Sequence, residues 1–218
     1  MPASTRRALG AVAAGLGIVI LVVGAWIVAI LGPSGQAQVS VTSKAPGSIV
    51  VTPNFLNAVD VPVRVTATRR DGGAVLLEVA PSADARAILA TSAVSTVSGV
   101  RYPAGGLDLH PSGAGALPDI STSDVWRLAA KGAGSAVLVV DQSRAPETLV
   151  VTSGDSTALT DVTLTMAWVD RAWFFEALAM AMIGAVLAAF ALNDLWQGRA
   201  TPVLHSEAAD TQAAQVTT

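Results

Sequence analysis

The sequence predicts a membrane protein in which two transmembrane α-helices flank a mainly-β extracytoplasmic domain, an antiparallel sandwich or barrel-like sheet with one short helix. Three observations lead to this fold class. The chain of 218 residues has a mean hydropathy of +0.56 and only 13% charged residues, which is more apolar than an ordinary soluble protein. One long apolar segment lies near each end of the chain, and the region between them alternates apolar and polar residues.

The two apolar segments set the expected boundaries. Residues 9–32 contain no charge, residues 174–192 contain only Glu176, and each run is near the ~20 apolar residues that cross a bilayer core. The residues after the second segment are polar and lack periodicity, which is typical of a disordered tail. We therefore expect a cytoplasmic N-terminus at 1–7, transmembrane helices at 8–32 and 172–193, an extracytoplasmic β-rich domain at 33–171, and a disordered cytoplasmic tail at 194–218.

The basic residues orient the chain in the plasma membrane. Arg6 and Arg7 directly precede the first segment and only Lys44 follows it closely, so the positive-inside rule places both termini in the cytoplasm and the middle region outside. A cleaved signal peptide is the alternative, since residues 35–37 have small side chains at the right spacing for cleavage. The apolar run exceeds the 7–15 residues of a usual signal-peptide core, which favours an uncleaved anchor.

Small residues recur along both apolar segments and indicate faces that helices could bring close together. The two helices could pack on each other, on another membrane or envelope protein, or on a second copy of the chain. The alternative is that alanine and glycine are simply frequent in this composition. The faces consist of Gly10, Ala14 and Gly17, with Ala11 and Gly15 beside them, and of Ala177, Ala181, Ala185 and Ala189. Glu176 lies about one turn inside the outer boundary, from where its carboxylate can reach the headgroups.

The region between the helices predicts short strands. Apolar residues alternate with polar ones at 61–68, and Asp71-Gly72 is a hairpin turn signal that leads into a second strand at 74–80. A helix is expected at 82–90, with Ser82 as its N-cap and Asp84 in its first turn, and a Gly/Pro-rich loop at 105–122. Further strands are expected at 38–42, 48–52, 95–102, 125–130, 135–141, 148–152 and 161–168.

Residues 63–90, VRVTATRRDGGAVLLEVAPSADARAILA, resemble a segment of an actinobacterial-type family of membrane proteins. That segment reads approximately VRVTAT, DG, VFVGIAP, then a helix beginning ADV and containing YLA. Asp84 and Leu89-Ala90 match it, and Ile88 replaces its Tyr. The family's later FW, GSG and VVVMNADGS-like motifs have counterparts at Trp126, 132–134 and 150–156, whereas its His after the helix and its Trp before the second motif are missing here. The resemblance implies an extracytoplasmic β-rich domain and indicates no mechanism.

Several functional classes lack the residues they need. The chain has no cysteine, which excludes disulfides, a thiolate nucleophile and cysteine-based metal sites. The net charge is −3 and no basic run occurs, so the sequence offers no electrostatic footprint for nucleic acid. Neither GxxxxGK[ST] nor GxGxxG occurs, and neither HExxH nor an EF-hand pattern occurs. We expect no cofactor and no metal.

Two loop features hold the remaining candidates for chemistry. Asp108 and His110 could form a hydrolytic arrangement with Ser112, although no GxSxG elbow accompanies them. Asp119, Ser121, Ser123 and Asp124 offer oxygens that could bind Ca²⁺, but capping and turn roles explain them more simply. The strand-to-helix turn at 79–84 could hold an anion at a helix N-terminus, but it lacks glycines for a close backbone approach and Asp84 would repel the anion. We interpret that turn as a structural corner.

These observations favour a non-enzymatic protein of the cell envelope that is anchored in the lipid bilayer and acts as an accessory, assembly or binding component through its outer domain. The first alternative is a sensor that binds an envelope ligand and signals through a membrane partner, because neither cytoplasmic end can hold an output domain. A hydrolase that uses the Asp108–His110 loop is the third hypothesis.

Overall fold

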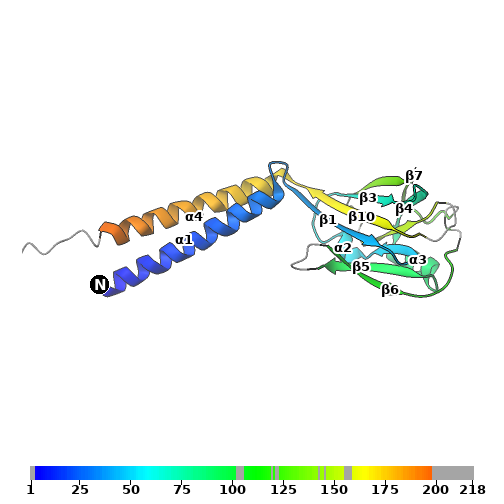
Figure 1. Cartoon of the computed structure of the whole chain (residues 1–218), viewed down its shortest axis with the longest axis horizontal. Helices are drawn as coiled ribbons and strands as arrows, with labels where there is room; N and C mark the ends of the chain where they lie inside the picture. The colour runs from blue at the N-terminus through cyan, green and yellow to red at the C-terminus, as the bar shows by residue number, and fades with distance from the viewer. Residues whose placement is uncertain are drawn as a thin grey trace, which may run out of the picture. The chain divides into compact units, whose positions relative to one another are not determined.

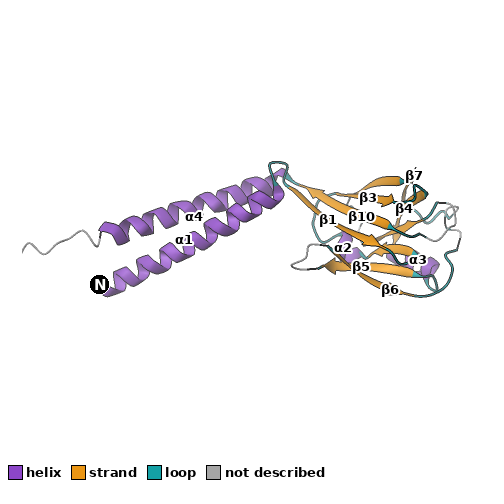
Figure 2. Cartoon of the chain, viewed as in Figure 1, coloured by secondary structure: helices purple, strands orange, loops and turns teal. Residues whose placement is uncertain are grey.

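The computed structural model divides the chain into two compact units, Ser34–Arg171 and a helical unit formed by Met1–Pro33 with Ala172–Thr218. Figure 1 shows the order of their elements, and Figure 2 distinguishes the helices from the strands. The structure describes residues 3–101, 106–118, 120, 123–141, 143–144, 146–154 and 159–197. Two long apolar helices thus flank a mainly-β domain along the chain, as the sequence predicts.

The helical unit is an antiparallel pair of α1 (Ala3–Leu31) and α4 (Arg171–Gln197). Both helices contain a span that is long and apolar enough to cross a membrane, Ala8–Leu31 and Arg171–Trp196. The backbones touch, because a Cβ atom added at Gly24 would lie 2.6 Å from the backbone nitrogen of Ala181, and one at Gly17 would lie 2.6 Å from that of Ala188. Only glycine permits so close an approach at these positions.

The small-residue face of α1 is confirmed in part, and that of α4 is corrected. Ala14 and Gly17 are buried between the helices, whereas a Cβ at Gly15 would meet nothing within 4 Å. On α4 the expected spacing by four is wrong, because Ala185 and Ala189 are exposed. A step of four residues advances 400° around a helix and drifts off one face, whereas alternating steps of four and three stay on it. The buried residues of α4 follow that alternation: Ala177, Ala181, Gly184, Ala188 and Ala191.

One sheet of the β-domain has four strands, and all of its pairings are antiparallel. Its order is β1 (Gln36–Ser43), β10 (Val162–Val169), β3 (Val63–Arg69) and β8 (Ser135–Val140). Because β1 and β10 pair from Gln36 with Val169 to Ser43 with Val162, the chain enters and leaves the domain at neighbouring points. The Asp170 N–H donates to the Gly35 carbonyl at 3.1 Å and extends this pairing by one step.

The second sheet has six strands and is mixed, which differs from the expected antiparallel arrangement. Its order is β6 (Leu107–Ser112), β5 (Val94–Val100), β2 (Ser48–Val51), β9 (Glu147–Thr152), β4 (Ala74–Pro81) and β7 (Leu128–Ala133). The β2–β5 pair is parallel and the other pairs are antiparallel. A parallel pair needs a long crossover, which β3, β4 and α3 (Ser82–Leu89) provide here.

Burial differs between the two sheets and shows which faces are covered. In β3 the apolar residues Val63, Val65 and Ala67 are buried while the polar residues between them face outward, so one face of the four-stranded sheet is open. All residues of β9 and most of β4 are buried, so the centre of the six-stranded sheet is covered on both faces. On its outer face, Ala80 and Val150 pack with Ala85, Leu89 and Ile120.

The Asp71-Gly72 turn joins two sheets and does not close a hairpin. Both flanking strands form as expected, but β3 pairs with β10 and β8, whereas β4 pairs with β9 and β7. The buried Arg69 guanidinium stabilises this corner by contacting Asp71 Oδ2 at 2.8 Å. The Gly73 N–H and Arg69 both bond the Asp71 carboxylate and hold its pKa below the usual value.

Other local expectations are also corrected. The loop expected at 105–122 contains strand β6, and the domain has a second short helix, α2 (Pro53–Leu56), besides the single short helix expected. Ser82 is the first residue of α3 and not its N-cap, because its hydroxyl donates to the Pro146 carbonyl at 3.2 Å. Helix α4 continues through 194–197, and the rest of the expected tail, 198–218, lies outside the described residues.

Candidate functional site

A groove on the outer face of the six-stranded sheet, beside α3, is the best-defined candidate site. Its volume is about 280 Å³, slightly below the range of about 300–1,000 Å³ typical of small-molecule sites. Strands β2, β5 and β9 contribute the floor, and α3 forms one wall. The residues that line this groove are Val50, Thr52, Pro53, Ser82, Ala85, Arg86, Leu89, Ala90, Val94, Thr96 and Thr148.

The strand registers explain why these side chains converge. Val50 of β2 lies opposite Val150 of β9 on one side and opposite Thr96 of β5 on the other, and directly paired residues project to the same face. Since side chains alternate along a strand, Thr148 and Val94 project to that face as well. On α3, Ser82, Ala85, Arg86 and Leu89 follow helical spacing and present one side to the floor.

Two hydroxyl groups of the groove have their hydrogens engaged by backbone carbonyls. Thr52 Oγ1 donates to the Val97 carbonyl at 3.2 Å, and Ser82 Oγ donates to the Pro146 carbonyl at the same distance. Each hydroxyl oxygen therefore keeps lone pairs that can accept a hydrogen bond from a ligand. Thr96 and Thr148 also line the groove and add two further hydroxyl groups to it.

Thr148 differs from the hydroxyls of Thr52 and Ser82. The residue is only 6% exposed, but its hydroxyl is not among the buried side-chain atoms without a partner and lines the groove. Thr148 is thus a polar group of the floor that is available to an occupant of the groove.

The groove has one charged side chain. Arg86 lies in the last turn of α3, is exposed, and makes no ion pair with any described residue. No acidic side chain occurs among the described residues of the lining. The groove therefore presents a positive charge to its occupant without an internal counter-ion.

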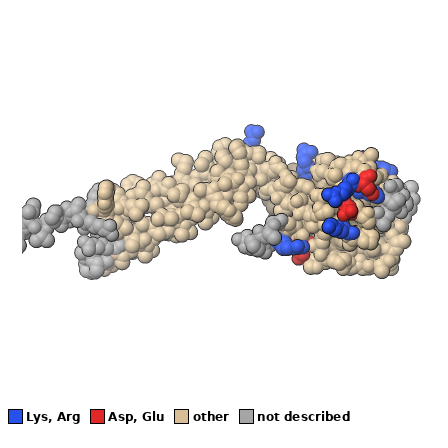
Figure 3. Space-filling view, viewed as in Figure 1, with Lys and Arg blue, Asp and Glu red and all other residues tan. Residues whose placement is uncertain are grey.

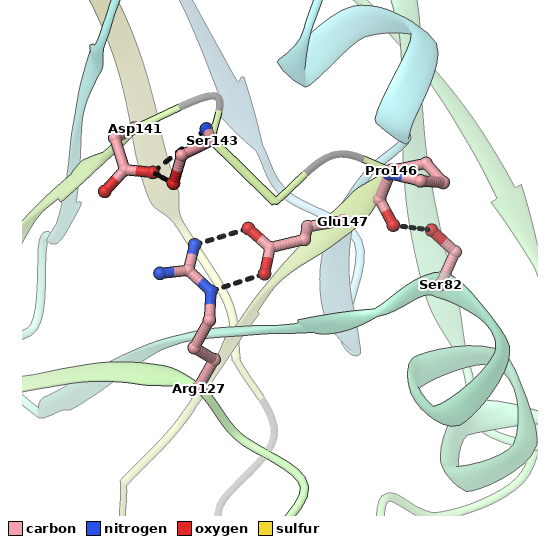
Figure 4. A network of polar contacts seen from close by, with 6 residues as sticks. All are labelled: Ser82, Arg127, Asp141, Ser143, Pro146 and Glu147. Carbon is pink, nitrogen blue, oxygen red and sulfur yellow. Dashed lines mark hydrogen bonds and ion pairs between the residues drawn. The ribbon is translucent and has the colours of Figure 1, made fainter.

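A buried ion pair fixes the chain segments at the end of the groove where α3 begins. Figure 4 shows the Arg127 guanidinium joined by two hydrogen bonds to the Glu147 carboxylate, beside the bond from Ser82 to Pro146. Glu147 is buried, and its carboxylate raises the pKa of Arg127. Ser143 hydrogen-bonds Asp141 in the same connection and lowers the pKa of that carboxyl. This network links the start of β9 to the start of α3 at one end of the groove.

Glu78 is a second unusual group on the same face of the sheet, one strand beyond the groove. The side chain is 2% exposed, and its Oε2 atom has no hydrogen-bond partner. Burial raises the pKa of this carboxyl to about 7. Glu78 pairs with Val150 of β9 and Ala129 of β7, so apolar side chains flank it within the sheet. Sequence reasoning did not single it out, although a lone acid in the run VLLEVA was a usable signal.

The structure brings Asp108 and His110 together on β6, at the edge of this same sheet face. His110 Nε2 lies 3.3 Å from Asp108 Oδ2, and Arg101 approaches Asp108 Oδ1 at 3.7 Å. His110 pairs with Thr96 of the groove. No hydrogen bond links Ser112 to His110 in the described part of the chain, and His110 is exposed. The pair forms a solvated surface contact beside the groove.

Two other features, a second cavity and the expected oxygen cluster, offer fewer groups that could bind a ligand or a metal. A cavity of about 400 Å³ is lined by small and apolar residues such as Gly47, Ala93 and Leu159, with no charged side chain among its described residues. Of the expected oxygen cluster, Asp119 and Ser121 lie outside the described residues. No group of three or more possible metal ligands occurs among the residues that the structure describes.

No protein-family model matches the chain, and no curated protein matches it.

Proposed function

We propose that the chain is a membrane-anchored, non-enzymatic protein of the cell envelope that acts by binding through its β-domain. The observation that carries this proposal is the exposure of large apolar side chains along both long helices, such as Trp26 at 58% and Phe190 at 71%. Figure 3 shows the described surface of these helices almost without charge on the face drawn. Exposed apolar area of this extent is unfavourable in water and favourable in lipid.

The arrangement of the helices supports an uncleaved anchor. Gly24 and Gly17 of α1 fit directly against Ala181 and Ala188 of α4, and removal of α1 would leave that face of α4 without its partner. The neighbouring entry and exit of the β-domain at Gln36 and Val169 suit two antiparallel helices that cross one membrane. With Arg6 and Arg7 on the cytoplasmic side, the β-domain lies outside the cell.

An accessory or assembly role predicts a stable partner in the membrane. Crosslinking and affinity purification of the full chain from native membranes should recover one protein in constant stoichiometry, or a second copy of the chain. Recovery of the monomer alone, with and without crosslinker, would contradict this role. A variant with Gly15→Leu on the exposed side of α1 tests whether that side contributes to the contact, since its Cβ meets nothing within the chain.

A ligand sensor is the second candidate, and the groove with its Thr148 hydroxyl favours it. A sensor requires that ligand binding changes the association with the partner, whereas an assembly component keeps its partner in both states. Purification with and without the ligand separates the two candidates. The hydrolase hypothesis is tested by D108A combined with H110A: a phenotype equal to that of a full deletion would revive it, and a normal phenotype would remove it.

A further inference from the structure

We propose that the groove between α3 and strands β2, β5 and β9 binds the carboxyl-terminal end of a polypeptide whose last residue has a small aliphatic side chain. This inference rests on the proposed function in one respect, namely that the β-domain acts by binding. The complementarity of charge, hydrogen bonding and shape between the groove and such a ligand carries it.

The charge of the groove selects an anion. Arg86 is the one charged side chain among the described lining residues, and it has no acidic partner in the described structure. A guanidinium presents a planar fork of N–H donors that matches the two oxygens of a carboxylate. A free α-carboxylate at the rim of the groove would satisfy Arg86, whereas a neutral amide would not.

The hydroxyl groups match a peptide backbone. The hydroxyl groups of Thr52 and Ser82 donate hydrogen bonds to the carbonyl oxygens of Val97 and Pro146. Their own oxygens can therefore accept hydrogen bonds from backbone N–H groups of the ligand. The Thr148 hydroxyl lines the groove and can donate to a carbonyl or carboxylate oxygen. A peptide end offers both N–H donors and oxygen acceptors within a few ångströms, as the groove requires.

The apolar surfaces and the volume restrict the side chain. Val50 and Val94 form the apolar floor, and Ala85 and Leu89 form the facing wall. About 280 Å³ accommodates roughly two small residues. No aromatic side chain lines the groove in the described residues, so a stacking platform for a sugar ring is missing there. A short aliphatic residue such as valine or alanine fits this surface.

The experiment measures binding of two probes to the full chain in lipid nanodiscs by isothermal titration calorimetry. The probes are acetyl-L-alanyl-L-valine and the same dipeptide with a C-terminal amide, which differ only in the charge at the end. We expect binding of the acid and at least 10-fold weaker binding of the amide. Equal affinities of the two probes, or no binding of the acid to the folded chain, would overturn the proposal.

Variants localise the binding to the groove. Arg86→Gln and Thr148→Val should each weaken the acid about 5–10-fold, since each removes one hydrogen-bonding group of the site. Arg101→Gln is the matched control, because Arg101 is exposed outside the lining and should leave the affinity unchanged. Thermal melting verifies that each variant is folded. Arg86→Gln is the decisive variant, because substitution of an exposed residue changes the stability of the fold little. Unchanged affinity in a folded Arg86→Gln variant would contradict the proposal. Membrane topology does not enter this measurement, so its failure would leave the membrane-anchoring proposal intact.

Discussion

The helical unit and the β-domain distribute their side chains in opposite ways. In the β-domain the described leucines that are buried, such as Leu77 and Leu164, form a core of large side chains, and the exposed large apolar residues are valines of the outer strand positions. In the helical unit the buried positions hold alanine and glycine, such as Ala181 and Gly24, while Trp196 is 77% exposed. A protein interior in water buries its large apolar groups, whereas helices in lipid gain nothing by doing so and associate through close backbone contact. The contrast supports the proposal that the helical unit is built for lipid and the β-domain for water.

The largest expected effect comes from truncating the same residue type in the two units. Leu77→Ala should destabilise the β-domain by about 2–5 kcal/mol, because it leaves a cavity in a close-packed interior. Leu187→Ala on the exposed side of α4 should change stability by no more than about 0.5 kcal/mol. Denaturant unfolding in detergent, followed by circular dichroism, measures both. Equal losses would contradict the assigned difference in environment.

The buried acid of the β-domain provides the second test. The pKa of Glu78 is raised from 4.5 to about 7, so the carboxyl stays protonated in the folded chain after it ionises in the unfolded chain. As far as Glu78 determines it, the free energy of unfolding is highest below pH 4.5 and decreases as the pH rises to about 7. Glu78→Gln should remove this slope and raise the stability at about pH 8 by up to about 3 kcal/mol. Unfolding curves on the two sides of this pH range test this, and a variant with an unchanged slope would be inconsistent with a buried, unpaired Glu78.

A smaller effect is expected from enlarging the small residues of the helical unit. A Cβ at Gly184 would lie 2.3 Å from the Leu21 backbone nitrogen, so Gly184→Leu should separate the helices at a cost of about 1–3 kcal/mol. Gly15→Leu is the control at a position without neighbours. Cysteines at Ala14 and Ala191, which the register places opposite each other, should form a disulfide in the parent and in Gly15→Leu. The Gly184→Leu variant should form less of it, and equal yields in all three would contradict the close packing.

The sequence was informative wherever a local pattern decides the structure. Apolar length predicts both long helices, and alternation such as that of Val63 and Val65 predicts β3 and its buried face. Local pattern failed where distant partners decide. Asp71-Gly72 has the composition of a hairpin turn, yet β3 pairs with β10 and β4 pairs with β9, which places the two flanking strands in different sheets. Strand β6 was missed because glycine and proline flank its short alternation LDLH, and pairing with β5 stabilises it.

The candidate groove could not be predicted from the sequence, because residues that are distant in the chain form it. Its floor combines Val50, Thr96 and Thr148, which are far apart in the chain and meet only through the parallel pairing of β2 with β5 and the antiparallel pairing with β9. Ser82 and Asp84 predict the helix that forms the wall of the groove, but the turn that leads into this helix is interpreted as a structural corner. The corner interpretation of the strand-to-helix turn is compatible with a wall of a binding groove, since Ser82 at the turn lines the groove together with Ala85 and Arg86 on the side of the helix.

The central claim is that the helical unit lies in lipid and the β-domain lies outside the cytoplasm. Because the chain has no cysteine, single cysteines can report on it directly. In intact cells, a membrane-impermeant maleimide should label Ser98→Cys, an exposed position of β5, and should label Thr211→Cys only after the membrane is permeabilised. Labelling of Thr211→Cys but not of Ser98→Cys in intact cells would reverse the orientation, and recovery of the chain in the soluble fraction would contradict the membrane assignment itself.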